Sequence, residues 1–303
     1  MHHFNLASLY ASKFTHSIHQ SDVATVFSAL IDKTMAAVID IAPAADDILG
    51  GFVNVASLVR SVSFHEGKLL EQAVIQIAKA NPNLVILHQS IRLPIVPAAE
   101  EALASNNWKE LDGIVFDSDV RCKKSYTPDL IIINMRTDAA TIIDMKRSLA
   151  SYGDTNRLGD LKSKMLASAL ALPDWLYKKH KRLSVKRVDV AIIDGASRAG
   201  ERSSGIWKLS ELDALLEIEG AATVMAALRA EFGKQARAAL ARETERAHAL
   251  PSRLAEKRGP GRPPKNRALI ESESRAMQAT ADVVQMPRRI SIGFAVPPAA
   301  NVG

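Results

Sequence analysis

Three side chains in the middle of the chain have the types and spacing that phosphate chemistry requires. Asp129 begins one aliphatic run, and Asp144 and Lys146 lie two positions apart in the next one. Side chains of a strand alternate between its faces, so Asp144 and Lys146 point the same way. Two carboxylates and a lysine on one face of a hairpin can hold a hard divalent cation beside a phosphate. These residues predict metal-assisted hydrolysis of a phosphodiester.

The register expected for this hairpin brings the groups together. With a turn at Thr137–Asp138, antiparallel pairing places Asp129 directly opposite Lys146 and makes Asp144 its diagonal neighbour. A different turn or a bulge would shift the pairing by about one or two residues. A fourth group is expected from an upstream helix, because the carboxylate of Glu71 could bind the metal directly or through water.

The elements that must position these side chains follow from hydrophobic periodicity. Residues 67–81 are expected to form an amphipathic helix with Leu70, Val74 and Ile77 on one face. The remaining elements are read as strands at 84–94, 130–133 and 141–146, a helix at 157–179 and a strand at 187–194. The order helix, three strands, helix, strand predicts an α/β fold, and the family resemblance described next implies that its central sheet is mixed and flanked by helices.

With these residues and this order of elements, the chain resembles the PD-(D/E)xK nuclease superfamily, which has the restriction-endonuclease-like fold. The resemblance rests on Pro128-Asp129, the fourteen residues that follow, and Asp144-Met145-Lys146. The order of elements supports it, and the match covers roughly residues 64–195.

The resemblance extends to the upstream helix, where Gly67-x-x-x-Glu71 is similar to the glutamate-bearing first helix of many members. It implies cleavage of DNA with Mg²⁺, or with Mn²⁺ as the alternative ion. It also implies that Asp129 and Asp144 are metal ligands and that Lys146 lies near the attacking water. Glu71 would be the auxiliary carboxylate and a third metal ligand, with Glu66 as the rival for that role.

A second motif lies near the C-terminus, where residues 257–265 resemble an AT-hook. An extended Gly-Arg-Pro backbone is thin enough for the narrow minor groove of A·T tracts, which attracts arginine. The residues expected to contact nucleic acid are Lys257, Arg258, Gly261, Arg262, Pro263 and Lys265. Pro260 lengthens the usual Arg-Gly-Arg-Pro spacing. The alternative is a generic basic linker, and either would raise the local concentration of DNA at another domain.

Composition divides the chain into four regions. Residues 1–63 are expected to be a helical N-terminal region, 64–206 the nuclease-like core, and 207–250 a helical extension rich in alanine. Residues 251–303 are rich in basic residues, proline and glycine and then become polar, so they are expected to form a disordered tail.

Charge and cysteine content indicate partners and compartment. The net charge of +6 favours polyanions, with DNA first and acidic membranes second, and no apolar run reaches the ~20 residues of a membrane-spanning helix. A single cysteine, Cys122, cannot form a disulfide within the chain and indicates a reducing cytoplasm, at the nucleoid if the source is bacterial. Its neighbours Arg121 and Lys123 would lower the pKa of its thiol.

The first function that these signals favour is a Mg²⁺-dependent DNA nuclease that is tethered to DNA by its tail. The alternative is an accessory or regulatory DNA-binding protein that uses a nuclease-like fold without chemistry. RNA stays open as a substrate, because the hairpin chemistry would act on either backbone. A homodimer would supply the two sites that many double-strand cutters need.

Overall fold

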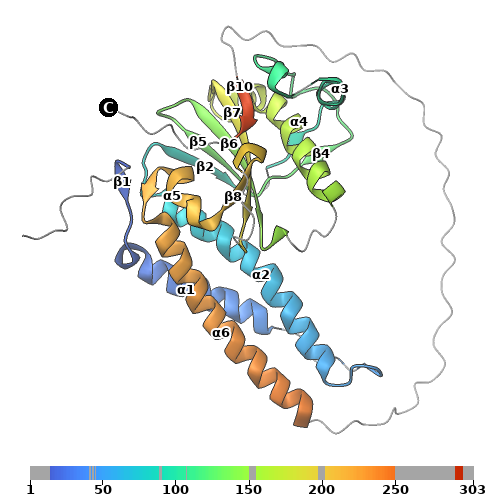
Figure 1. Cartoon of the computed structure of the whole chain (residues 1–303), viewed down its shortest axis with the longest axis vertical. Coiled ribbons are helices and arrows are strands. Elements are labelled where there is room, and N and C mark those ends of the chain that lie inside the picture. The colour runs from blue at the N-terminus through green and yellow to red at the C-terminus, as the bar shows by residue number, and fades with distance from the viewer. Residues whose placement is uncertain are drawn as a thin grey trace, which may run out of the picture.

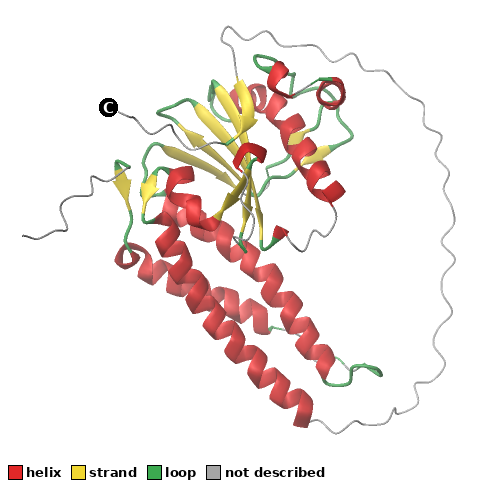
Figure 2. Cartoon of the chain, in the orientation of Figure 1, coloured by secondary structure: helices red, strands yellow, loops and turns green. Residues whose placement is uncertain are grey.

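The computed structural model describes residues 14–40, 42, 44, 46–88, 91–106, 108–149, 155–196, 202–249 and 291–295. These residues form a mixed α/β fold, which confirms the predicted class (Figures 1 and 2). The helices are α1 (Gln20–Ile39), α2 (Phe52–Ala78), α3 (Pro97–Ser105), α4 (Thr155–Lys179), α5 (Leu212–Leu216) and α6 (Ala221–Ala249). The strands are β1 (His16–Ser17), β2 (Leu84–His88), β3 (Leu93–Pro94), β4 (Ser125–Tyr126), β5 (Leu130–Asn134), β6 (Ala139–Lys146), β7 (Arg187–Asp194), β8 (Ile206–Lys208), β9 (Ile218–Glu219) and β10 (Ser291–Phe294).

The central sheet has the strand order β10-β7-β6-β5-β2, and β8 also pairs with β7. Strands β2, β5 and β6 form an antiparallel meander, whereas β7 runs parallel to β6. The crossover from β6 to β7 contains α4, as parallel pairing requires a long connection. The sheet is therefore mixed, as predicted.

Alternation along the strands divides the core between two faces of the sheet. Leu130 and Ile143 pack with α1, α2 and α6, while Ile131 and Ile142 pack with α3 and α4. All four side chains are inaccessible to solvent. Because both faces are covered, β5 and β6 read as continuous aliphatic runs instead of alternating patterns. Figure 1 shows α4 on one side of the sheet and the α2–α6 pair extending beyond it on the other.

Helix α2 is longer than predicted, because it begins at Phe52 and runs through the expected boundary between residues 63 and 64. Its first half packs against α1 and α6, and its second half packs under the sheet. The helical N-terminal region, the core and the helical extension thus share one hydrophobic core.

One strand comes from the region that was expected to be largely disordered. Ser291–Phe294 form β10, which pairs in parallel with the first half of β7. The backbone carbonyl of Ala295 accepts a hydrogen bond from the buried indole of Trp207 at 3.0 Å, and its N–H donates to Val190 at 3.1 Å. The prediction was wrong for this segment, because β7 offers an open edge that only the folded sheet creates.

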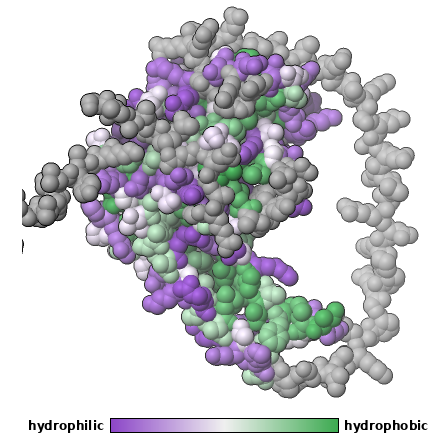
Figure 3. Space-filling view, viewed as in Figure 1, coloured by the Kyte–Doolittle hydropathy of each residue, from purple (hydrophilic) through white to green (hydrophobic). Residues whose placement is uncertain are grey.

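Hydrophobic side chains also gather on the surface, at the end of α2 farthest from the sheet (Figure 3). They include Ile48, Leu49, Phe52 and Val59, of which Ile48 is 93% exposed. In the part of the chain that the structure describes, no helix has the length and apolar character to cross a membrane.

The junction between β7, β8 and β10 provides a test of the fold. Gly205 has φ +76°, and a Cβ at this position would overlap the ring of Phe294 on β10. We expect Gly205→Ala to lower the free energy of unfolding by about 1–3 kcal/mol. Gly159→Ala in α4 is the control, because its Cβ would meet nothing within 4 Å and should add about 0.5–1 kcal/mol. Urea denaturation of both variants measures the difference, and equal stabilities would contradict the placement of β10.

Candidate functional site

Pairing between β5 and β6 sets the positions of the acidic residues. Leu130 pairs with Ile143 and Asn134 with Ala139, so one further step along the ladder places Asp129 opposite Asp144. The predicted pairing of Asp129 with Lys146 was wrong by two residues. Asp144 and Lys146 do lie on one side of β6, and the ammonium of Lys146 forms an ion pair with Oδ1 of Asp144.

The turn explains the difference in register. The connection is a four-residue loop, 135–138, instead of a turn centred on Thr137–Asp138. The side-chain oxygen of Asn134 accepts hydrogen bonds from the backbone N–H groups of Arg136 and Thr137, at 3.0 and 3.3 Å. Asp138 closes the loop in the left-handed region, with φ 51°. An Asx-type turn of this kind begins at its asparagine, which moves the loop towards β5.

The side chain of Asp129 links the start of β5 to the end of β6 by a hydrogen bond. One oxygen of its carboxylate accepts a hydrogen bond from the backbone N–H of Met145 at 2.6 Å. Burial and then the charge of Asp144 raise the pKa of Asp129 to about 6, against the lowering effects of the Met145 N–H and Lys146. The carboxylate therefore holds its negative charge in an unfavourable environment, which a nearby cation would improve.

Asp144 is buried and is held from two sides. The hydroxyl of Tyr126 donates a hydrogen bond to Oδ2 at 2.9 Å, while Lys146 pairs with Oδ1. Tyr126 lies on β4 and is itself buried, so it fixes the orientation of the carboxylate. The sequence analysis assigned no role to Tyr126, although its position three residues before Asp129 indicated that it could lie near this carboxylate.

Glu71 reaches the same end of the sheet from α2. Its pKa is raised to about 7, first by burial and then by the charges of Asp129 and Asp144, while Lys68 and Lys146 lower it. Like charges act on a pKa in this way only when they lie close together. The structure thus brings Glu71, Asp129, Asp144 and Lys146 into one cluster, which we call the carboxylate cluster.

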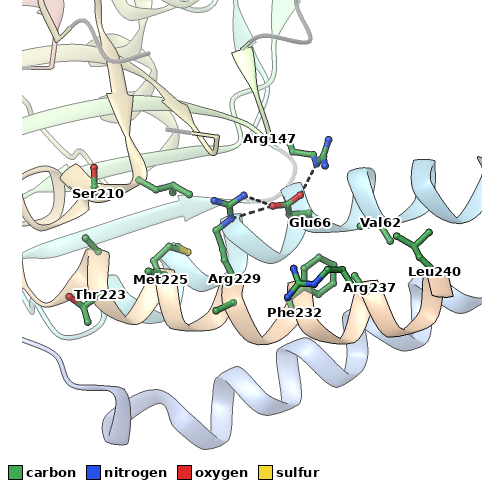
Figure 4. A pocket seen from close by; sticks show the side chains of 16 residues that line it. Val62, Glu66, Arg147, Ser210, Thr223, Met225, Arg229, Phe232, Arg237 and Leu240 are labelled. Carbon is green, nitrogen blue, oxygen red and sulfur yellow. Dashed lines mark hydrogen bonds and ion pairs between the residues drawn. The ribbon is translucent and has the colours of Figure 1, made fainter. Parts of the chain in front are cut away.

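Glu66, the alternative to Glu71 as the auxiliary carboxylate, binds two arginines instead. It is a buried residue, and its carboxylate binds Arg147 at 2.7 Å and Arg229 through two nitrogens at 2.7 and 3.2 Å (Figure 4). These contacts use both carboxylate oxygens. Glu66 therefore links α2, the end of β6 and α6, and it is not directed at the carboxylate cluster.

The contacts of Arg229 also support the backbone of Lys146. Arg229 donates from Nη1 to the carbonyl of Gly195 at 2.6 Å, and the N–H of Gly195 donates to the carbonyl of Lys146 at 2.7 Å. A Cβ on residue 195 would lie 3.0 Å or less from the backbone oxygens of Lys146 and Arg147, so the close approach requires glycine. We call Glu66, Arg147, Arg229 and Gly195 the arginine clamp. Its members lie too far apart in sequence to be linked by any local pattern.

The donor set decides what kind of ion the cluster could take. Among the described residues, no group of three or more His, Cys, Asp or Glu side chains is arranged to hold a metal ion. Mg²⁺ does not need such a cage, because it is commonly bound by one or two carboxylates together with water and substrate phosphate. The facing pair Asp129 and Asp144 suits an ion of this kind, with Glu71 acting through water.

Two other predictions have different outcomes. The AT-hook-like residues lie outside the part of the chain that the structure describes. They are Lys257, Arg258, Gly261, Arg262, Pro263 and Lys265. The expectation for Cys122 was wrong, because burial and the charge of Glu100 raise the pKa of its thiol. Its Sγ contacts the carbonyl of Val120 at 3.1 Å, which places the thiol against the protein.

Comparison with known proteins found no matching family model, no matching curated protein and no matching solved structure.

The two glutamates of α2 should respond in opposite ways to loss of charge. Glu66→Gln should lower the free energy of unfolding by about 1–3 kcal/mol, because the buried carboxylate that pairs with the partly exposed arginines Arg147 and Arg229 loses its charge. Glu71→Gln should raise it at pH 8 by roughly 1 kcal/mol, since solvent still reaches this carboxylate and screens the repulsion. Urea denaturation at pH 5 and pH 8 measures both variants.

The pH dependence has a definite sign. Because the pKa of Glu71 is raised from 4.5 to about 7, its contribution to stability is fully present below pH 4.5 and is lost as pH rises through about 7. The wild-type protein should lose this stability between pH 5 and pH 8, whereas Glu71→Gln should not. A Glu71→Gln variant that is less stable than wild type at pH 8 would refute the repulsive cluster.

Proposed function

We propose that the protein is a Mg²⁺-dependent nuclease that hydrolyses phosphodiester bonds in DNA. The observation that carries the proposal is the carboxylate cluster, in which Glu71, Asp129 and Asp144 act on one another electrostatically beside Lys146. Neighbouring carboxylates whose pKa values are raised, as those of Glu71 and Asp129 are, are costly to a fold and are typical of functional sites. A divalent cation between Asp129 and Asp144 would offset that cost.

The arrangement of elements is the second support. The main elements come in the order of a restriction-endonuclease-like core. They are helix α2, the antiparallel strands β2, β5 and β6, the crossover helix α4 and the parallel strand β7. In such a core the acidic residues stand at the end of the two middle strands, where Asp129 and Asp144 lie. We therefore propose membership of the PD-(D/E)xK superfamily for residues 64–206.

The chain's own residues divide the chemistry among them. Asp129 and Asp144 would hold the metal, and the Met145 N–H and the Tyr126 hydroxyl orient their oxygens. A bound Mg²⁺ supplies positive charge that polarises the phosphate and lowers the pKa of a coordinated water. Lys146 then places its ammonium where negative charge develops on the phosphate.

Glu71 has the properties of a proton acceptor. Its pKa of about 7 lies near neutral pH, where a general base combines an available ionised form with useful basicity. It approaches the cluster from α2, whereas Asp129 and Asp144 come from the sheet. In this role it would accept the proton of the attacking water.

The basic tail is proposed to hold the substrate. Residues 257–265 carry the AT-hook-like sequence, and a weak minor-groove contact would keep the cluster close to DNA. The second candidate function is DNA binding without cleavage. It is favoured by the ion pair of Asp144 with Lys146, which already supplies one of the carboxylates with a cation.

Cleavage of plasmid DNA tests the proposal. Wild-type protein should cut in Mg²⁺ and not in EDTA, and Asp144→Asn or Lys146→Met should slow cleavage by at least ~100-fold. Asp138→Asn is the matched control, because it removes a carboxylate from the other end of the same hairpin where asparagine tolerates φ 51°. A parallel assay with RNA distinguishes the two backbones. Cleavage that persists undiminished in Asp144→Asn would rule out the cluster as the active site.

Gel shifts in EDTA test the tail separately. Arg262→Ala should weaken binding to an A·T-rich duplex more than binding to a G·C-rich duplex of equal length, because only the former has the narrow minor groove. Arg267→Ala, just beyond the motif, should weaken both equally. Equal losses for Arg262→Ala on the two duplexes would instead indicate a generic basic linker. Binding that depends wholly on residues 250–270, in a protein that never cleaves, would favour the accessory function.

A further inference from the structure

A groove lies between α2 and α6, beside the arginine clamp (Figure 4). Its volume is about 760 Å³, and it is open to solvent along α6. Four of the α6 residues that line it are small, namely Ala222, Ala226, Ala230 and Gly233, beside larger apolar residues that include Met225, Phe232 and Leu240. These small side chains leave room for a ligand to approach the helix closely.

The charge of the groove is positive. Its charged lining residues are Glu66, Arg147, Arg229 and Arg237, which give a formal net charge of +2. Glu66 binds Arg147 and Arg229, so one carboxylate serves two guanidinium groups. Arg237 has no ion-pair partner among the described residues and is exposed. Figure 4 shows Arg237 farther along α6 than Arg229, away from Glu66.

The groove adjoins the carboxylate cluster. Arg147 directly follows Lys146, and alternation along the strand turns the two side chains to opposite sides. Lys146 meets Asp144, while Arg147 meets Glu66 at the groove. Glu66 and Glu71 are five residues apart on α2, a rise of about 7.5 Å. The groove and the cluster therefore lie on opposite sides of the end of β6 and are connected through α2.

We propose that this groove binds the phosphate backbone of nucleic acid that passes the end of β6 from the carboxylate cluster, with Arg237 as its phosphate contact. The inference rests on the proposed nuclease function and extends it to the path of the substrate. Arg229 cannot serve in the same way, because its guanidinium is already bound to Glu66 and to the carbonyl of Gly195. The hydroxyls of Ser210 and Thr223, at the other end of the groove, can donate to further phosphate oxygens.

Salt dependence of binding tests the proposal in the full-length protein. The probe is a fluorescently labelled 20-base-pair duplex, titrated in EDTA over a series of KCl concentrations so that no cleavage occurs. Arg237→Ala should reduce the slope of log K against log [KCl] by about 0.9, as expected for one lost phosphate contact. Arg237→Glu should reduce it further, and both variants change an exposed side chain.

Arg242→Ala is the matched control. Arg242 is also an exposed arginine of α6, but it does not line the groove, so its loss should leave the slope unchanged. Equal slopes for wild type and Arg237→Ala would overturn the inference, as would equal reductions for Arg237→Ala and Arg242→Ala. A change of oligomeric state in Arg237→Glu without a change of slope would also overturn it, in favour of a protein partner.

The outcome is separable from that of the nuclease proposal. A protein that cleaves DNA but keeps its slope in Arg237→Ala would refute the groove alone. A protein that never cleaves, yet loses slope specifically in Arg237→Ala, would refute the nuclease and support the groove as a nucleic-acid surface.

Discussion

The antiparallel pairing of β5 with β6 is the constraint on which the site depends. It places Asp129 and Asp144 opposite each other at the end of two buried aliphatic strands, where burial and mutual repulsion raise the pKa of Asp129. The pairing is stabilised by aliphatic side chains packed on both faces of the sheet. Hydrophobic burial thus sustains an electrostatic arrangement that is unfavourable by itself. The Met145 N–H and the Tyr126 hydroxyl limit that cost, because each donates to one carboxylate.

Two glutamates on one helix illustrate how neighbours decide a side chain's role. Glu66 and Glu71 lie less than two turns apart on α2, where Glu66 is buried and Glu71 is partly buried. Two arginines neutralise Glu66, one of them from α6, more than 160 positions farther along the chain. Glu71 faces two further carboxylates, which oppose its ionisation. Glu66 therefore links elements of the fold, whereas Glu71 is available for the proposed reaction.

The arginine clamp joins the helical extension to the sheet. Through Arg229 and Gly195, α6 is linked to the backbone of Lys146. The long helices α1, α2 and α6 are thus continuous with the core, and they share its hydrophobic interior. The role proposed for Lys146 would gain from such support, because the position of a charged group controls its effect on a reacting phosphate.

The sequence by itself determined the local features of this protein. Aliphatic runs identified β5, β6 and β7, and helical periodicity identified α4 and the second half of α2. Those same patterns selected Glu71, Asp129, Asp144 and Lys146, because strand and helix periods decide which side chains share a face. Only the tertiary structure decided the register, since the side chain of Asn134 sets the turn and shifts the pairing. It also decided that Glu66 is a structural link and that residues 291–294 join β7, because both depend on partners distant in sequence. Local propensity acts over a few residues, whereas an ion pair or a sheet edge exists only after distant segments have come together.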